Sequence, residues 1–237
     1  LAFVMLLSGC SIDKWAVRKV ADMLSTDSGS LVFLGDDDPE LVGDALPFAI
    51  KLYESLLESA PEHQKLLLST GKAYALYTYA FVQTPALYLP DEKYELQEKM
   101  IERAKKLYLR SRKYILKALF LKNPGFEKVF EEASLNKDAY LAALGKMDEP
   151  DLPYLYWVAS AWMGAFSTDV FDMEMLVSSP RAIAMLHRVL ELEDGYDRGG
   201  VHDILTTYYG SLPESSGGSE EKAREHYKKA LEYAETA

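Results

Sequence analysis

The side chains that most often carry out catalysis are few in this chain and lie far apart. The 237 residues contain four histidines, His63, His187, His202 and His226, and none has the spacing of a metal-binding motif. No nucleophile elbow, phosphate-binding loop, dinucleotide-binding loop or zinc-protease motif occurs. We therefore expect no catalysis, no metal and no cofactor, and we interpret the histidines as surface or helix-packing residues. An enzyme is the third hypothesis, which a buried pair of carboxylates in a cleft would revive.

The acidic run Asp36-Asp37-Asp38 offers the oxygen ligands that Ca²⁺ prefers. It stands directly before Pro39, however, and proline is favoured in the first turn of a helix. Negative charge stabilises a helix N-terminus, so we interpret the run as a helix entry. The turn at residues 194–197 is also acidic, but the rest of an EF-hand loop is missing.

The single cysteine, Cys10, excludes an internal disulfide and stands where a modification is expected. Residues 1–9 are almost entirely apolar and uncharged, like the end of a secretory signal, and are too short to span a bilayer. The tetrapeptide Leu7-Ser8-Gly9-Cys10 resembles the lipobox of bacterial lipoproteins, whose small residues let a peptidase approach the backbone. The sequence thus predicts lipidation of Cys10, with a buried cysteine as the alternative.

Three segments follow from this prediction. Residues 1–9 are part of a lipoprotein signal peptide, whose start and basic region are missing from the sequence. Residues 10–35 form the lipidated N-terminal segment and linker, and residues 36–237 form the helical domain. Ser11 directly after the cysteine favours the outer over the inner membrane, so we expect a lipid-anchored protein that faces the periplasm.

Aromatic side chains are in excess, with 16 tyrosines and three tryptophans. They supply rigid contact area with a polar tip and are useful on binding surfaces, although packing between helices explains each one as well. As a group they could line a groove or an internal cavity. The candidates for ligand or partner binding are Tyr74, Tyr77, Tyr154, Trp157, Trp162, Tyr208 and Tyr209.

Composition limits the partners. Hydrophobic residues make up 49% of the chain, which is enough for a substantial core. The formal charge of −11 argues against nucleic acid, because phosphate binding needs a basic face. The same charge repels an anionic membrane surface, so we expect membrane contact through the lipid anchor alone.

Nearly all of the chain after Cys10 has helical periodicity, and no strand alternation is sustained. We expect breaks at Pro61, between Pro85 and Pro90, and at Pro180, with Pro180 as a first helical residue. The long segment 91–122 is expected to kink or break near Ser111. Helices are predicted at 11–25, 39–60, 62–84, 91–122, 150–166, 180–193, 197–212 and 219–236, with shorter ones within 126–145 and 170–178.

The spacing of small and large residues predicts tetratricopeptide-like helical hairpins. Ala49, Tyr53, Leu56 and Pro61 fit the second helix of such a unit, and Leu67, Gly71 and Tyr74 then fit the first helix of the next without insertion. Small residues in this pattern let two helices approach closely. The predicted fold is all-α, an α-solenoid of tetratricopeptide-like hairpins. The sequence stops directly after a second-helix pattern and without a capping element, so we expect that it is truncated or that another subunit covers this end.

Several stretches together resemble the T component (TatT family) of tripartite ATP-independent periplasmic, or TRAP, transporters. They are the lipobox with Ser11-Ile12, residues 46–60 and 71–81, Tyr154 to Ala165, His202 with Tyr208-Tyr209, and residues 211–224. The resemblance implies a lipoprotein that assembles as a homotrimer, binds the substrate-binding P component, and has a channel or cleft suited to an apolar ligand. It implies no catalytic residues. The alternative is a general tetratricopeptide scaffold lipoprotein in outer-membrane or cell-wall assembly.

Overall fold

The computed structural model describes residues 10–25 and 35–235, and every regular element in these ranges is helical. The predicted all-α class is confirmed, whereas the solenoid of tetratricopeptide-like hairpins stays a prediction. The α-helices are α1 (Cys10–Leu24), α3 (Pro39–Ser59), α4 (Gln64–Thr78), α5 (Thr84–Leu87), α6 (Tyr94–Lys122), α7 (Phe126–Glu131), α8 (Lys137–Leu144), α9 (Leu152–Ser167), α10 (Met173–Leu192), α11 (Tyr196–Ser211) and α12 (Glu220–Glu235).

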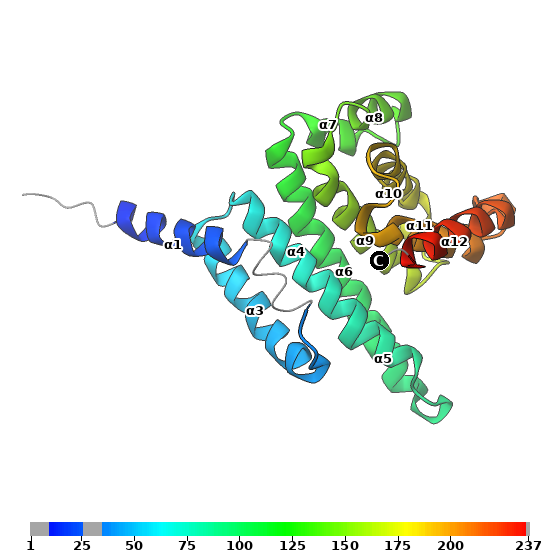
Figure 1. The fold of residues 1–237 in the computed structure, drawn as a ribbon, viewed down its shortest axis with the longest axis horizontal. Helices are drawn as coiled ribbons and strands as arrows, with labels where there is room; N and C mark the ends of the chain where they lie inside the picture. The colour runs from blue at the N-terminus through cyan, green and yellow to red at the C-terminus, as the bar shows by residue number, and fades with distance from the viewer. Residues whose placement is uncertain (1–9, 26–34, 236–237) are drawn as a thin grey trace, which may run out of the picture.

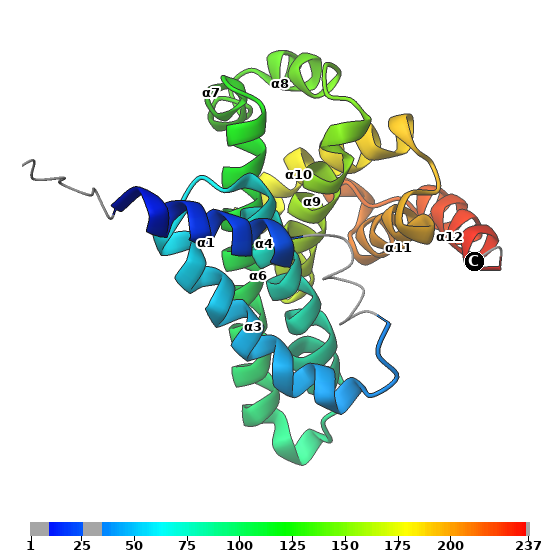
Figure 2. The same ribbon diagram turned by 60° about the vertical axis from the view of Figure 1, so that its left-hand side comes forward.

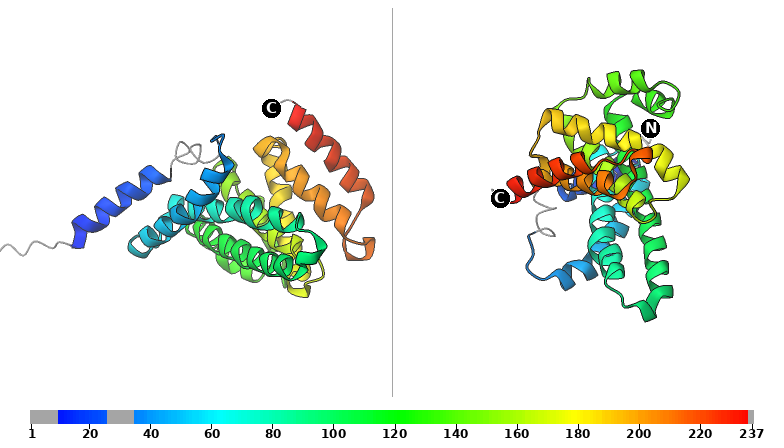
Figure 3. Two further views of the ribbon diagram at one scale, coloured as in Figure 1. Left: turned by 90° about the horizontal axis from the view of Figure 1, so that it is seen from below. Right: turned by 90° about the vertical axis from the view of Figure 1, so that its right-hand side faces the viewer.

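The long helix α6 lies at the centre of the fold, with α4 along one side and α9 along another (Figure 1). Helix α10 packs against the far side of α9, while α3 and α1 cover α4. Helices α7 and α8 cap one end of this body (Figure 2). Helices α11 and α12 form an antiparallel pair at its edge (Figure 3). Within the described ranges, none of the helices is long and apolar enough to cross a bilayer.

Side chains at the helix starts confirm the interpretation of the acidic run. Asp38 is the N-cap of α3 and accepts a hydrogen bond from the Leu41 N–H at 3.0 Å. Asp172 caps α10 in the same way, accepting from the Met175 N–H at 2.9 Å. Each carboxylate takes up a backbone donor that a helix N-terminus leaves unpaired.

The helix that begins with α4 runs three residues past its predicted end at residue 84 and stops at Leu87, within the expected break between Pro85 and Pro90. It passes through a π-helical turn, Tyr79–Gln83, and continues as α5 to Leu87. A π-turn bonds residues five apart, here the Thr84 N–H to the Tyr79 carbonyl, and thereby accommodates a proline without an N–H. The turn also directs Gln83 inwards, where it accepts from the Tyr108 hydroxyl at 2.6 Å.

Two expectations about helix breaks are wrong. Helix α10 begins at Met173, so Pro180 lies inside it. The Leu176 carbonyl, which has no N–H partner at position 180, accepts the Ser179 hydroxyl at 3.0 Å instead. Helix α6 runs for 29 residues without a break at Ser111, whose buried hydroxyl donates to the Gly71 carbonyl at 2.7 Å.

Gly71 confirms the expectation that a small residue permits close helix approach, although the partner is α6. A Cβ at this position would lie 2.2 Å from Ile115 Cγ1 and 3.0 Å from the Ser111 backbone oxygen. Ile115 is fully buried and cannot move into solvent. The distance between α4 and α6 therefore depends on the missing side chain.

Gly71→Ala is expected to lower the free energy of unfolding by about 1–3 kcal/mol, because an added methyl group overpacks this contact. Urea denaturation would measure the change. Gly210→Ala is the matched control, since its Cβ would meet only Ala223 at 3.7 Å in an exposed part of α11. The control should be as stable as the parent protein or slightly more stable, because alanine is the better helix former. Equal destabilisation by both changes would contradict the account.

Candidate functional site

Most of the aromatic residues predicted to bind a ligand or partner lie in the core of the protein. Tyr77 and Trp157 are partly buried. Lys72 and Arg103 lie near their rings, at 5.4 Å from the Trp157 centroid and 5.8 Å from the Tyr77 centroid, respectively. The buried members are Tyr74, Tyr154, Trp162, Tyr208 and Tyr209.

Tyr74 belongs to a polar cluster around Glu54, which is only 9% exposed on α3. One carboxylate oxygen accepts the Tyr74 hydroxyl at 2.8 Å and the Tyr114 hydroxyl at 2.7 Å, and Arg110 pairs with it at 2.5 Å. The other oxygen accepts from Lys51 at 2.5 Å. Burial tends to raise the pKa of Glu54, but these hydrogen bonds and the Arg110 charge outweigh burial and lower the pKa. The cluster joins α3, α4 and α6 around one ionised carboxylate.

Trp162 on α9 is a meeting point of four helices. Its indole is 1% exposed, and Nε1 donates to the Ser178 hydroxyl on α10 at 3.2 Å. The Phe130 ring on α7 lies 5.8 Å away between centroids. Arg112 from α6 and Arg181 from α10 place their guanidinium carbons 4.5 Å and 5.0 Å from the Trp162 centroid.

A cluster of histidine and tyrosine side chains holds α12 against α11, and sequence reasoning missed it. Nδ1 of His202 lies 2.8 Å from Nδ1 of His226, although 24 residues separate them. Tyr209 stacks on His226 at 5.8 Å, and Tyr233 stacks on His202 at the same distance. Asp194 lies 3.4 Å from Nε2 of His202. The four-residue periodicity of α11 and α12 placed each side chain on an inner face but gave no register between the helices.

This cluster disfavours two charged histidines at once, because only one nitrogen of a close Nδ1–Nδ1 pair can carry a proton. Burial, with smaller contributions from the neighbouring His202 and His187, lowers the pKa of His226 to about 4. Burial also lowers the pKa of His202, although Asp194 acts in the opposite direction. The imidazole of His226 is therefore neutral in the folded protein at neutral pH.

Stability is expected to decline as the pH falls from about 6.5 towards about 4. A histidine whose folded pKa is depressed binds fewer protons folded than unfolded, so acid favours unfolding in this range. The part of this decline that is due to His226 should be about 1–2 kcal/mol of unfolding free energy, a figure that allows for solvent screening. Melting temperatures of the parent protein and His226→Asn across this range would measure it. An equally steep decline in the variant would contradict the role of His226.

A surface groove of about 600 Å³ lies between the C-terminal part of α11 and the start of α12. Of the seven predicted aromatic residues, Tyr209 lines it. Apolar surface alternates there with charged side chains from α12. The lining residues are Thr206, Tyr209, Gly210, Leu212, Pro213, Glu214, Ser219, Glu220, Ala223, Arg224 and Tyr227.

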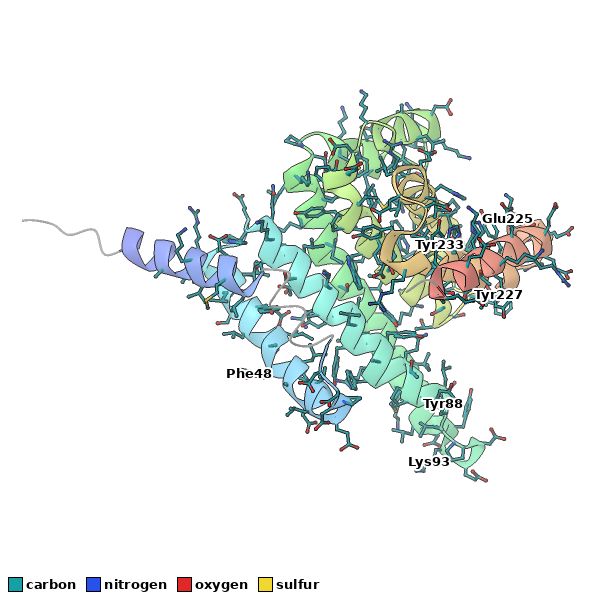
Figure 4. All side chains as sticks on the ribbon, viewed as in Figure 1. Phe48, Tyr88, Lys93, Glu225, Tyr227 and Tyr233 are labelled. Carbon is teal, nitrogen blue, oxygen red and sulfur yellow. The ribbon has the colours of Figure 1, made fainter. Side chains whose placement is uncertain are left out.

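Large apolar side chains are also exposed around the turn between α5 and α6 (Figure 4). We call this set the turn patch; it comprises Leu87, Tyr88, Tyr94 and Leu96, which are 61%, 84%, 58% and 47% exposed. Phe48, 74% exposed, lies apart from it on α3. Exposed apolar residues gathered at one place are typical of surfaces that contact another protein.

Among the described residues, no group of three or more histidine, cysteine or acidic side chains is arranged to hold a metal ion. Cys10 is the first residue of α1, and its predicted lipidation stays a prediction. Helix α1 packs against α3 and α4, where Ala21 is fully buried and Asp22 pairs with His63 at 3.1 Å.

Comparison with known proteins agrees with the resemblance drawn from the residues. The chain is 35% identical over 247 aligned residues to an uncharacterized protein of Treponema pallidum (strain Nichols). That alignment covers 98% of this chain and 75% of the relative. Residues 35–237 match the family described as TRAP transporter T-component, so this chain belongs to the TRAP transporter T-component family.

Proposed function

We propose that this protein is a non-catalytic accessory component of a TRAP transporter that binds the periplasmic substrate-binding P component. The observation that carries the proposal is the family match over residues 35–237, which takes in every helix from α3 to α12. The absence of recognisable catalytic motifs from the sequence is consistent with it.

The exposed turn patch supports a role in protein contact. Tyr88 and Tyr94 present aromatic rings to solvent at the end of the α4–α6 pair. Tyrosine is enriched among the residues that dominate binding energy at protein interfaces, because it buries a large area with little loss of side-chain entropy. We propose that a P component or a second copy of this chain covers these rings.

We also propose that the protein is anchored through a lipidated Cys10, faces the periplasm from the outer membrane, and assembles as a homotrimer. The Leu7-Ser8-Gly9-Cys10 motif supports the anchor, and the family resemblance supports the trimer. An apolar ligand is proposed for the groove between α11 and α12, where Tyr209 and Leu212 supply apolar surface.

Co-purification with the P component tests the main proposal. The full chain, carrying its own Cys10, is expressed together with a TRAP-type P component from the same cell and isolated by affinity. We expect the two proteins to elute together, and we expect Tyr88→Ser with Leu87→Ser to weaken the complex or the trimer. Phe48→Ser is the control, since it removes an equally exposed apolar side chain elsewhere.

The proposal would be overturned if the protein were lipidated and correctly located but did not retain the P component. Retention of outer-membrane or cell-wall assembly proteins in its place would favour the scaffold alternative. Light scattering on the purified protein tests the trimer separately, and Cys10→Ala tests the anchor by releasing the protein from the membrane fraction.

A further inference from the structure

Two arginines meet over Trp162 without a carboxylate to balance them. Arg112 comes from α6 and Arg181 from α10, and both guanidinium carbons lie within 5.0 Å of the same ring centroid. Among the described residues, no aspartate or glutamate comes within 4.0 Å of either guanidinium. Both side chains are partly buried, so water screens their mutual repulsion incompletely.

The N–H groups of these arginines are also largely unpaired. A guanidinium has five N–H donors. Arg112 makes no hydrogen bond with any residue that the structure describes, and Arg181 makes one long bond, to the Phe130 carbonyl at 3.4 Å. Two other arginines on the same two helices do have acceptors. Arg110 pairs with Glu54 at 2.5 Å, and Arg188 donates to the Met147 carbonyl and to Glu191.

Stacking on the indole accounts for the position of the two cations, and their N–H groups, which stay accessible to solvent, can take an acceptor from solution. A cation over an aromatic ring is attracted by the ring's charge distribution. Burial lowers the pKa of Arg112, and the charge of Arg181 lowers it further, whereas Glu174 acts in the opposite direction from beyond ion-pair distance. Two like charges at one partly buried place repel each other, and an anion between them relieves that repulsion.

We propose that Arg112 and Arg181 form a binding site for a small oxyanion, over Trp162 and between α6 and α10. The planar fork of a guanidinium matches the paired oxygens of a carboxylate, a phosphate or a sulfate. The buried rings of Phe130 and Trp162 lie against the guanidiniums and hold them in position. This site is separate from the turn patch and does not depend on binding of a P component.

Calorimetric titration with sodium acetate, sodium phosphate and sodium sulfate, against sodium chloride at equal ionic strength, tests the proposal on the full chain. At least one oxyanion should bind saturably to the parent protein. The preferred anion identifies the group recognised, carboxylate or phosphate-like. Direct titration is needed because phosphate and sulfate stabilise many proteins without a site.

Four variants and one control make the test specific. Arg112→Met and Arg181→Met should each weaken binding roughly tenfold or more, since a charge-assisted hydrogen bond is lost. Arg112→Lys should also bind more weakly, because it keeps the charge but not the fork. Glu174→Gln should bind more tightly, because it removes a competing carboxylate. Arg18→Met, at an exposed position on α1, is the control and should bind like the parent.

A melting experiment without added anion separates this site from a purely structural pair. Methionine can cover the indole at position 112 without a charge, so Arg112→Met should melt at or above the parent temperature. No saturable binding of any of the three anions would overturn the proposal. Unchanged affinity in Arg112→Met, or a clear loss of stability in that variant without anion, would overturn it as well.

Discussion

Trp162→Ala is expected to lower the free energy of unfolding by about 3–5 kcal/mol, the usual cost of removing a fully buried aromatic side chain. For a chain of this size the melting temperature should fall by roughly 6–20 °C. The indole is 1% exposed and contacts helices α6, α7 and α10 from α9. Its removal leaves a cavity and deprives the Ser178 hydroxyl of its donor.

Trp157→Ala is the matched control for this prediction. Trp157 lies five residues earlier on the same helix but is only partly buried, so its removal should cost clearly less. Thermal unfolding followed by circular dichroism would compare the two. A Trp162→Ala protein within about 1 kcal/mol of the parent would contradict a core role and favour Trp162 as an accessible binding residue.

Glu54→Gln is expected to lower the free energy of unfolding by about 2–3 kcal/mol. The carboxylate accepts from Lys51, Tyr74 and Tyr114 and pairs with Arg110. An amide has one acceptor oxygen in place of two. Its NH₂ group is itself a donor and would face these donors without forming a hydrogen bond. Two partners, Lys51 and Arg110, are about half exposed or more, so the loss should be smaller than for a fully buried ion pair.

The pH dependence of this variant gives a second readout with a definite sign. The folded pKa of Glu54 lies below its ordinary value of 4.5, so its stabilising effect is present above pH 4.5 and is lost as the pH falls through the folded pKa. Glu54→Gln should therefore lose less stability in acid than the parent does. Urea denaturation at pH 7 and below pH 4 measures both effects.

Glu58→Gln is the control, since Glu58 is exposed one turn further along α3. It should change stability by no more than about 0.5 kcal/mol. If Glu54→Gln and Glu58→Gln changed the free energy of unfolding equally at pH 7, the hydrogen-bonded cluster would contribute nothing to stability beyond surface charge.

Local sequence patterns predicted helix existence well and helix continuity less well. Periodic apolar residues gave nearly all of the helices, and the acidic residues before Pro39 gave a helix start that Asp38 confirms as an N-cap. The expected break at Pro180 was wrong, and the helix predicted to end at residue 84 runs on to Leu87. At Pro180 the Ser179 hydroxyl takes the place of the missing N–H, and at Pro85 a π-turn leads into the proline. Such compensation depends on packing that a local pattern does not contain.

The predicted aromatic residues illustrate a similar division. Composition identified Tyr74, Trp162 and Tyr209 as important, but it did not distinguish core from surface, since an aromatic ring suits both. The structure places all three among buried contacts, and the exposed rings, Tyr88 and Tyr94 among them, are other ones. No feature of their spacing marked these two, because exposure at the end of a helical pair depends on where the neighbouring helices stop.

The sequence by itself determined the all-α class, the approximate position of the helices, the predicted modification of Cys10, and the family, because each of these depends on residues close together in the chain. Tertiary structure alone decided which charges meet. His202 with His226, Glu54 with Arg110, and Arg112 with Arg181 are brought together from separate helices. Helical periodicity predicts which face of its helix each side chain occupies. It does not predict how that helix is rotated, or shifted along its axis, relative to the next helix. Contacts such as that of Gly71 with Ile115 set the rotation and the shift of one helix relative to the next. They thereby decide whether a charged side chain lies beside a partner of opposite charge or remains able to bind a ligand.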